Sequence, residues 1–253
     1  VLKDPIAAQH EIGYLPEGAP SYEDMTVMAS LRFIGKARGF FGQELKQRVD
    51  SVVSKVELES VLTKRVETLS KGFRRRLGIA QALIHDPKVL ILDEPTDGLD
   101  PNQKHQVREL IRNLSADKTV IVSTHILEEV SAVCTRAMIL AKGEIVFDGT
   151  PTELAAKSDF HNAVTIRLGK FSEVVIGALK KIDKVEKVVV SDEQQITVFS
   201  KGGQPILAEV NQVLQRGNCL LDELHVEVGR LDDVFRKVTL ESNQTTNTAE
   251  EQA

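Results

Sequence analysis

The sequence predicts an α/β fold with a parallel sheet, followed by a small α+β module. Buried aliphatic runs at 88–92 and 119–123 alternate with helical periodicity at 102–114 and 126–133, which is typical of a helix-covered parallel sheet. Beyond residue 163 the predicted order is strand, helix, strand, strand, helix, strand, as in a ferredoxin-like module. The length of 253 residues allows one large domain or two modest ones.

Composition narrows the class of protein. The net charge is -5 and 42% of residues are hydrophobic, so no basic footprint for nucleic acid is visible and we expect no nucleic-acid partner. No apolar run approaches the 18 or so residues of a membrane span. Two isolated cysteines, Cys134 and Cys219, indicate a reducing, cytoplasmic compartment without a disulfide framework.

The first third of the chain is predicted to be mainly helical. A short apolar segment at 12–15 precedes continuous helical periodicity over 26–62, and a further helix starts near Ser70 and stops before Asp86-Pro87. The arginines at 74–76 are expected on a solvated helix face or as contributors beside a phosphate. The apolar stripes expected in this helical core contain Val27, Leu31, Ile34, Ala37, Phe40, Phe41, Val49, Val52, Val53 and Val56.

The remaining elements complete the two predicted domains. We expect a hairpin over 137–148 that turns at Lys142-Gly143, and a helix capped by Thr150. The predicted domains are 1–158, with a helical subdomain at about 22–85, and 159–240, followed by a disordered tail at 241–253. In the second domain we expect strands at 164–168, 185–190, 196–199 and 220–228, and helices at 172–182 and 205–215.

Two adjacent carboxylates, Asp93 and Glu94, end the first aliphatic strand. Open α/β sheets bind ligands at the carboxyl ends of their strands. An aspartate there can hold Mg2+ through its waters, and a neighbouring glutamate can orient an attacking water or take its proton. Taken alone, the pair fits a solvated strand end about equally well.

Three further segments carry weaker signals. Ser70, Lys71 and Gly72 start a helix whose free amides and positive dipole end form an anion site, although a simple N-cap explains them as well. Asp100 follows a tight Gly98-Leu99 turn. His125 follows the second aliphatic strand, which predicts an imidazole near the same sheet edge, but a lone histidine there usually packs or bonds a turn.

The ordered motifs resemble one family. The stretch "LSKGFRRRLGIAQALIHDPKVLILDEPTDGLDP" followed by "STH" is similar to the nucleotide-binding subunits of ABC transporters, over roughly residues 1–155. The resemblance implies a P-loop NTPase-type sheet with ATP and Mg2+ as cofactors. It implies that Asp93 belongs to the Walker B strand and binds the metal, that Glu94 is the catalytic glutamate, and that His125 senses the γ-phosphate.

The resemblance also implies roles for the weaker signals. Residues 69–73 match the signature loop, with Lys71 and Phe73 as departures, so Ser70, Lys71 and Gly72 would contact ATP bound to the other subunit. Asp100 matches the D-loop. Glu17 stands where the family has a glutamine that approaches Mg2+, and its extra charge departs from that pattern.

One motif of the family is missing from the sequence. The phosphate-binding pattern G-x-x-x-x-G-K-[ST] does not occur between Val1 and Ala253. We expect a truncated chain whose first core strands and Walker A loop precede Val1, rather than a degenerate site. We therefore expect the 253-residue chain to be inactive alone and the full-length protein to be an ATPase.

The implied partners are a second ATPase subunit and a membrane permease. Two copies, or two paralogues, would close head to tail on ATP, and a transmembrane permease would hold them at the inner face of the cell membrane. The stretch "GYLPE" and the C-terminal module are similar to the exporter-type branch that includes gliding-motility and multidrug systems. The module shows no catalytic set and could be regulatory, ligand-sensing or a dimer contact.

Three alternatives remain. A DNA-repair ATPase would carry a long coiled coil between Glu17 and Ser70, which are only 53 positions apart here. A translation-associated protein would carry two cassettes in one chain. The third alternative is a regulatory subunit that does not hydrolyse ATP.

Overall fold

The computed structural model describes residues 3–169, 173–192, 195–217 and 221–237. It divides into two compact units, Val1–Val133 and Cys134–Ala253. This division groups the predicted hairpin with the second unit, whereas the sequence places the domain boundary after residue 158. The predicted domain limits therefore stay a prediction, and the tail at 241–253 lies outside the described residues.

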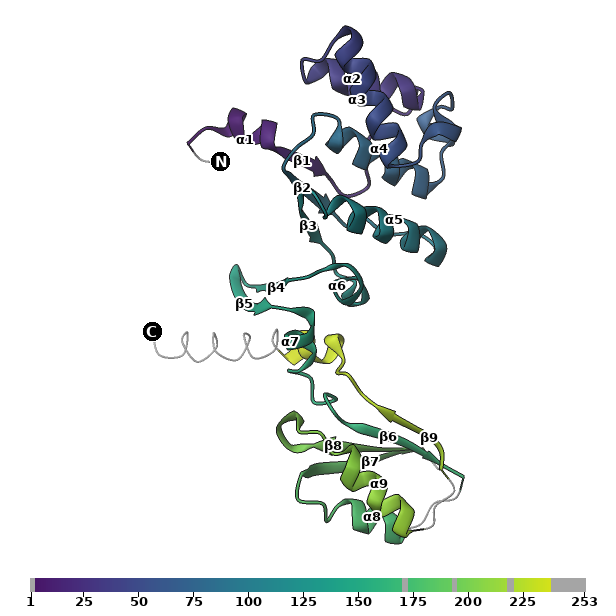
Figure 1. The fold of residues 1–253 in the computed structure, drawn as a ribbon, viewed down its shortest axis with the longest axis vertical. Helices are drawn as coiled ribbons and strands as arrows, with labels where there is room; N and C mark the ends of the chain where they lie inside the picture. Colours follow the sequence, from purple (N-terminus) through teal and green to yellow (C-terminus); the bar gives the residue numbers. More distant parts are fainter. Residues whose placement is uncertain (1–2, 170–172, 193–194, 218–220, 238–253) are drawn as a thin grey trace. The chain divides into compact units, whose positions relative to one another are not determined.

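A three-stranded parallel sheet forms the centre of the first unit, as predicted (Figure 1). Strands β1 (Ile12–Leu15), β2 (Val89–Asp93) and β3 (Thr119–Ser123) lie in the order β1-β2-β3. The register pairs Leu15 with Leu92 and Asp93 with Ser123. The carboxyl ends of the three strands therefore lie along one edge of the sheet, and the candidate site lies at this edge.

The helices before β2 differ from the continuous prediction over 26–62. Helices α2 (Val27–Ala37) and α3 (Gly42–Lys55) are separated by residues 38–41, where Gly39 adopts a φ value of +90° that a right-handed helix does not allow. Short 3₁₀ turns at 59–61 and 66–68 lead to α4 (Lys71–Leu83). Helix α1 (Pro5–Glu11) was not predicted, although Asp4 caps it and Pro5 occupies its first turn.

Burial corrects two expectations about this helical region. Ala37 is exposed and Phe41 is 62% exposed, because the break at Gly39 places Phe41 at the start of α3. Phe40 is half-buried under the Arg48 guanidinium, 3.9 Å from its ring centre. The expected core positions that are fully buried are Val27, Leu31, Val49, Val52, Val53 and Val56.

The prediction of a solvated arginine face on α4 is wrong for Arg75 and Arg76, which are 6% and 9% exposed. Helix α4 lies in the middle of the core, so both sides of the helix are covered. Arg76 donates to Val56 O at 3.0 Å, to Glu57 Oε2 at 2.6 Å and to Gln106 Oε1 at 3.1 Å. These acceptors compensate the burial of its charge.

The last helices of the first unit are α5 (Pro101–Leu114) and α6 (Leu127–Val133). Asp100 caps α5, whose buried stripe is Val107, Leu110, Ile111 and Leu114. Arg112 on α5 donates to Ala132 O on α6, which joins the two helices. Helix α6 is therefore fixed against α5, beside the carboxyl ends of the strands.

The second unit begins with the predicted hairpin. Strands β4 (Ala137–Ala141) and β5 (Glu144–Gly149) pair antiparallel, and the two turn residues, Lys142 and Gly143, have φ values of +52 and +83°. Two successive positive φ values are those of a type I′ turn, which suits the twist of a hairpin. Helix α7 (Pro151–Ala155) follows, with a capping box between Thr150 and Glu153.

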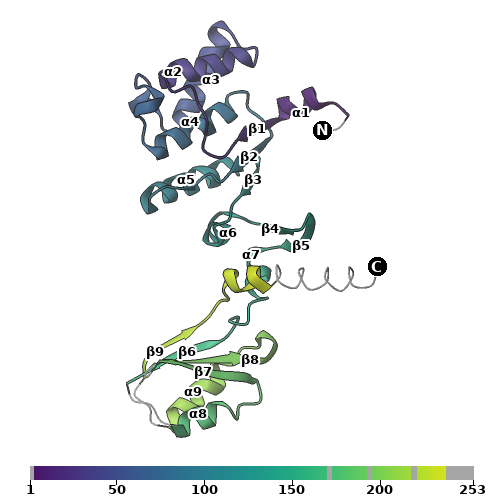
Figure 2. The same ribbon diagram turned by 180° about the vertical axis from the view of Figure 1, so that it is seen from behind.

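The ferredoxin-like prediction for the rest of the unit is confirmed. Strands β6 (Val164–Leu168), β7 (Val185–Asp192), β8 (Gln195–Ser200) and β9 (Leu221–Val226) form an antiparallel sheet in the order β7-β8-β6-β9. Helices α8 (Glu173–Leu179) and α9 (Leu207–Arg216) cover one face in both views (Figure 1, Figure 2). The predicted helix start at 172, the predicted strand start at 220 and the predicted domain end at 238–240 lie outside the described residues.

Two further segments of this unit were not predicted. Residues 201–203 form a 3₁₀ turn, and residues 231–237 are helical. Asp233 accepts hydrogen bonds from Ser158 Oγ at 3.0 Å and from the Asp159 amide at 3.1 Å, which anchors this segment near the end of α7. Within the described part of the chain, no helix has the length and apolar character needed to cross a bilayer.

Candidate active site

Asp93 is held by side chains from both neighbouring strands. Ser123 Oγ donates to its Oδ1, and Tyr14 Oη donates to its Oδ2 at 3.4 Å. The parallel register brings both donors to Asp93, since Ser123 pairs directly with Asp93 and Tyr14 pairs with Ile91, two residues before Asp93 on β2. The half-buried carboxylate is thereby fixed at the sheet edge, with lone pairs left for further ligands.

Glu94 leaves the strand in a left-handed conformation, with φ of +45°. Its amide donates to Ser123 O at 3.0 Å, and its side chain is only 17% exposed. Oε1 accepts from the backbone amide of His125 at 3.0 Å and lies 2.8 Å from Nδ1 of the same residue. Oε2 is buried without a hydrogen-bond partner among the described residues, so it remains available as an acceptor.

His125 faces outward from this carboxylate. Its side chain is 70% exposed. The hydrogen bond to Glu94 and the charge of that carboxylate raise the pKa of His125 above its ordinary value. The structure therefore brings the predicted residues Asp93, Glu94 and His125 to one edge of the sheet.

The predicted anion loop at 69–73 lies against residues 98–103 of the same chain. Ser70 caps α4, and its Oγ accepts from the Phe73 amide at 3.3 Å. A Cβ on Gly72 would lie 3.1 Å from the Gln103 side chain, so glycine permits this close approach. Lys71 Nζ lies 3.1 Å from the place that a Cβ on Gly98 would take.

Asp100 and Glu17 are both exposed. Asp100 caps α5 by accepting from the Gln103 amide at 2.9 Å. Glu17 lies in the turn that follows β1. Neither side chain contacts Asp93 or Glu94 in the described hydrogen bonds and ion pairs, so their predicted ligand roles stay predictions.

Arg75 is a further residue near this site, and a position beside a phosphate was one of the two expectations for the arginines at 74–76. Its Nη2 donates to Asp97 O at 3.5 Å, and Asp97, Glu17, Glu94 and Asp93 attract its charge. Burial is the larger influence and lowers the pKa of Arg75. The signal was its place on the buried stripe of α4, three residues after Gly72.

The donors at this edge fit Mg2+ only in combination with a ligand. Among the described residues, no group of three or more His, Cys, Asp or Glu side chains could hold a metal ion. Mg2+ commonly takes one or two carboxylates and completes its shell with waters and phosphate oxygens. The fixed Asp93 carboxylate is a hard oxygen donor of the required kind.

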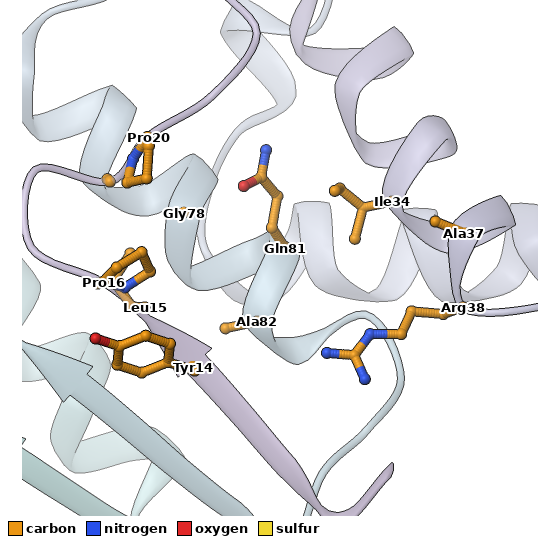
Figure 3. A pocket seen from close by; sticks show the side chains of 11 residues that line it. Tyr14, Leu15, Pro16, Pro20, Ile34, Ala37, Arg38, Gly78, Gln81 and Ala82 are labelled. Atoms are coloured by element: carbon orange, nitrogen blue, oxygen red, sulfur yellow. The ribbon is translucent and has the colours of Figure 1, made fainter. Parts of the chain in front are cut away.

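A pocket of about 260 Å³ lies between β1, α2 and α4. Figure 3 shows Ile34 on α2 and Arg38 just after that helix opposite Gln81 on α4, with Tyr14 and Pro16 beside them at the end of β1. The pocket therefore lies beside the segment that leads from Tyr14 to Glu17.

Comparisons with known proteins point to one family. A sequence model described as "ABC transporter" matches residues 3–97. The Nod factor export ATP-binding protein I of Rhizobium sp. (strain N33) is 33% identical over 245 residues, which cover 94% of this chain and 77% of that protein. The linearmycin resistance ATP-binding protein LnrL of Bacillus subtilis (strain 168) is 29% identical over 239 residues, with coverage of 94% and 77%.

A solved structure agrees with the sequence comparisons. The structure of CbiO1 from Clostridium perfringens, described as part of the ABC transporter complex CbiONQ, matches with a TM-score of 0.56 and 28% identity. The match covers 60% of this chain and 62% of that one.

Proposed function

This chain belongs to the family of ABC transporter ATP-binding proteins, and on that premise we propose that the edge formed by Asp93, Glu94 and His125 is the hydrolytic part of its ATP site. The chain is an ATP-binding and ATP-hydrolysing subunit of an ABC transporter. The observation that carries the residue assignment is the Glu94 carboxylate, which has one oxygen bonded twice by His125 and the other buried and unpartnered.

The two oxygens of Glu94 suit two tasks. His125 fixes Oε1, which prevents rotation of the carboxylate, while Oε2 can accept a hydrogen bond from the water that attacks the γ-phosphate. Asp93 would bind Mg2+ beside it, and the ion would neutralise charge on the phosphates. His125, exposed and bonded to Glu94, would contact the γ-phosphate with its outer ring edge.

The loop that starts α4 is proposed to serve a second copy. Ser70 and Lys71 are exposed at a helix N-terminus, where amides and dipole attract anions. In a head-to-tail dimer they and Gly72 would meet ATP bound to the other subunit, and Asp100 would lie near the same interface. Glu17 would approach the metal, with Arg75 compensating its charge from within the subunit.

A membrane permease is the proposed second partner. The pocket between α2 and α4 is beside the segment before Glu17, so a cytoplasmic helix of a permease seated there would reach the ATP site through β1. This arrangement would hold the subunit at the cytoplasmic face of the membrane. The named export and resistance functions of the two relatives support an exporter.

Glu94→Gln in the assembled transporter tests the assignment. The amide keeps the size of the side chain but cannot take a proton, so turnover is expected to fall by about 10²- to 10⁴-fold, as for loss of a general base. ATP binding should persist, and nucleotide-bound dimers should accumulate in size-exclusion chromatography. The exposed Glu128→Gln is the matched control. Turnover within a few-fold of the parent would refute the role of Glu94.

A further inference from the structure

Glu129 is a buried acid for which the proposed reaction has no use. It lies on α6 and is only 3% exposed. Its Oε1 accepts from Thr96 Oγ1, and its Oε2 accepts from Thr124 Oγ1 at 3.1 Å. Arg108 Nη2 on α5 is 3.7 Å from Oε1. Two hydroxyl donors and a cation therefore compensate the burial of this carboxylate.

The hydroxyl protons of both threonines are committed to Glu129. Thr124 Oγ1 accepts from the Ile126 amide at 3.0 Å, so its single proton is directed to the carboxylate. Thr96 is 1% exposed and has no access to water that could replace the contact. Each contact is therefore costly to lose, because a buried polar atom would remain unsatisfied.

These contacts close a ring around the proposed base. Thr96 follows Glu94 by two residues, and Thr124 immediately precedes His125. Glu129 joins the two threonines, and the opposite side of the ring is closed by His125 bonding to Glu94 Oε1. The loop after β2 and the loop after β3 therefore meet twice, once at the reacting edge and once at Glu129.

We propose that Glu129 is a positioning residue that sets the distance between Glu94 and His125 by holding both loops from behind. The inference rests on the proposed function of that pair. Glu129 would act on the pair through Thr96 and Thr124. Arg108 extends the hold to α5, so that the helix capped by Asp100 moves with the two loops.

The first test is Glu129→Gln in the complete transporter. The amide group replaces one acceptor oxygen with a donor, so the threonine that faces it can no longer donate to residue 129, while the side-chain volume is kept. Hydrogen–deuterium exchange should rise at residues 94–98 and 123–126, while the Glu128→Gln control exchanges like the parent. Since a displacement of about 1 Å can cost 10²-fold, kcat should fall by about that factor with KM for ATP unchanged.

Thr96→Val and Thr124→Val test the same ring if Glu129→Gln does not fold. Each valine removes one threonine hydrogen bond to Glu129. The kcat of the double variant should fall no further than that of the more affected single variant, because one missing hydrogen bond already breaks the link between the two loops. Glu129→Asp should not restore kcat, since the shorter side chain cannot reach both hydroxyls. Normal exchange in both loops with parental kcat in these variants would overturn the inference.

The two proposals fail separately. If Glu94→Gln leaves turnover intact while the Glu129 and threonine variants still raise exchange in both loops, the assignment of Glu94 as the base is wrong. The role of Glu129 in holding the two loops would then still stand. If Glu94→Gln stops turnover while the Glu129 and threonine variants change neither exchange nor kcat, the proposed function stands and the positioning role is wrong.

Discussion

His125 presents two nitrogens to a single oxygen of Glu94: its backbone amide and its Nδ1 lie 3.0 and 2.8 Å from Oε1. A side-chain contact alone would break whenever the exposed imidazole rotated. The amide contact keeps the carboxylate oriented in either case, so the free oxygen Oε2 always faces the same way. This double contact also links the ionisation of His125 to Glu94.

We expect the imidazole of His125 to titrate above its ordinary pKa of 6.5, because the Glu94 carboxylate favours the protonated ring. Because the pKa is raised in the folded state, the contact stabilises the folded protein in full at pH values below the ordinary pKa. This stabilisation is lost as the pH rises through the raised pKa. NMR titration of the ring protons measures the shift.

Glu94→Gln should return the pKa of His125 toward its ordinary value, because the carboxylate charge is gone. His85 is the internal control, since burial lowers its pKa and it is bonded to Ile12 O, away from Glu94. An unchanged His125 titration in the variant would show that the contact does not persist in solution.

Arg76→Ala should destabilise the protein by about 2 to 4 kcal/mol, because it empties a buried position and leaves the buried acceptor Val56 O without this donor. Glu57→Gln should cost under about 1 kcal/mol, since that side chain is 75% exposed and its ion pair is screened by water. Urea unfolding compares the two. Equal losses would mean that the ion pair, and not the buried guanidinium, carries the energy.

Gly13→Ala should destabilise the first unit by about 1 to 3 kcal/mol, because the new methyl group would lie 2.3 Å from Ala82 O on α4. Gly177→Ala is the matched change in α8, where nothing lies within 4 Å of the added carbon. Here alanine should stabilise by about 0.5 to 1 kcal/mol through helix propensity. Thermal unfolding of both variants checks the opposite signs, and a neutral Gly13→Ala would show that β1 can move away from α4.

Much of the fold follows from local patterns. The aliphatic runs at 88–92 and 119–123 gave strands with nearly the predicted limits, and Lys142-Gly143 gave the expected turn. The helical break at Gly39 was missed, because apolar spacing continues across it while the backbone does not. Burial of Arg75 and Arg76 was also missed, since charge argues for water unless the tertiary acceptors are known.

The candidate site also contains residues that the sequence predicts and residues that it does not. Asp93, Glu94 and His125 could be found because each directly follows a strand, and parallel strands end together. The partners that hold them, Tyr14 on one strand and Glu129 on α6, could not be found. Their contacts depend on strand register and helix rotation, which a linear pattern does not contain.

The contact between Lys71 and the turn at Gly98 lies within one subunit, yet both segments are proposed to work at the boundary with another. A displacement of either segment must shift its neighbour, since the lysine amine fills the space above the glycine. In a symmetric dimer, ATP hydrolysis at one catalytic centre would then depend on the state of the other centre. Cooperativity between identical sites would thus originate inside each polypeptide, before any contact across the pair is counted.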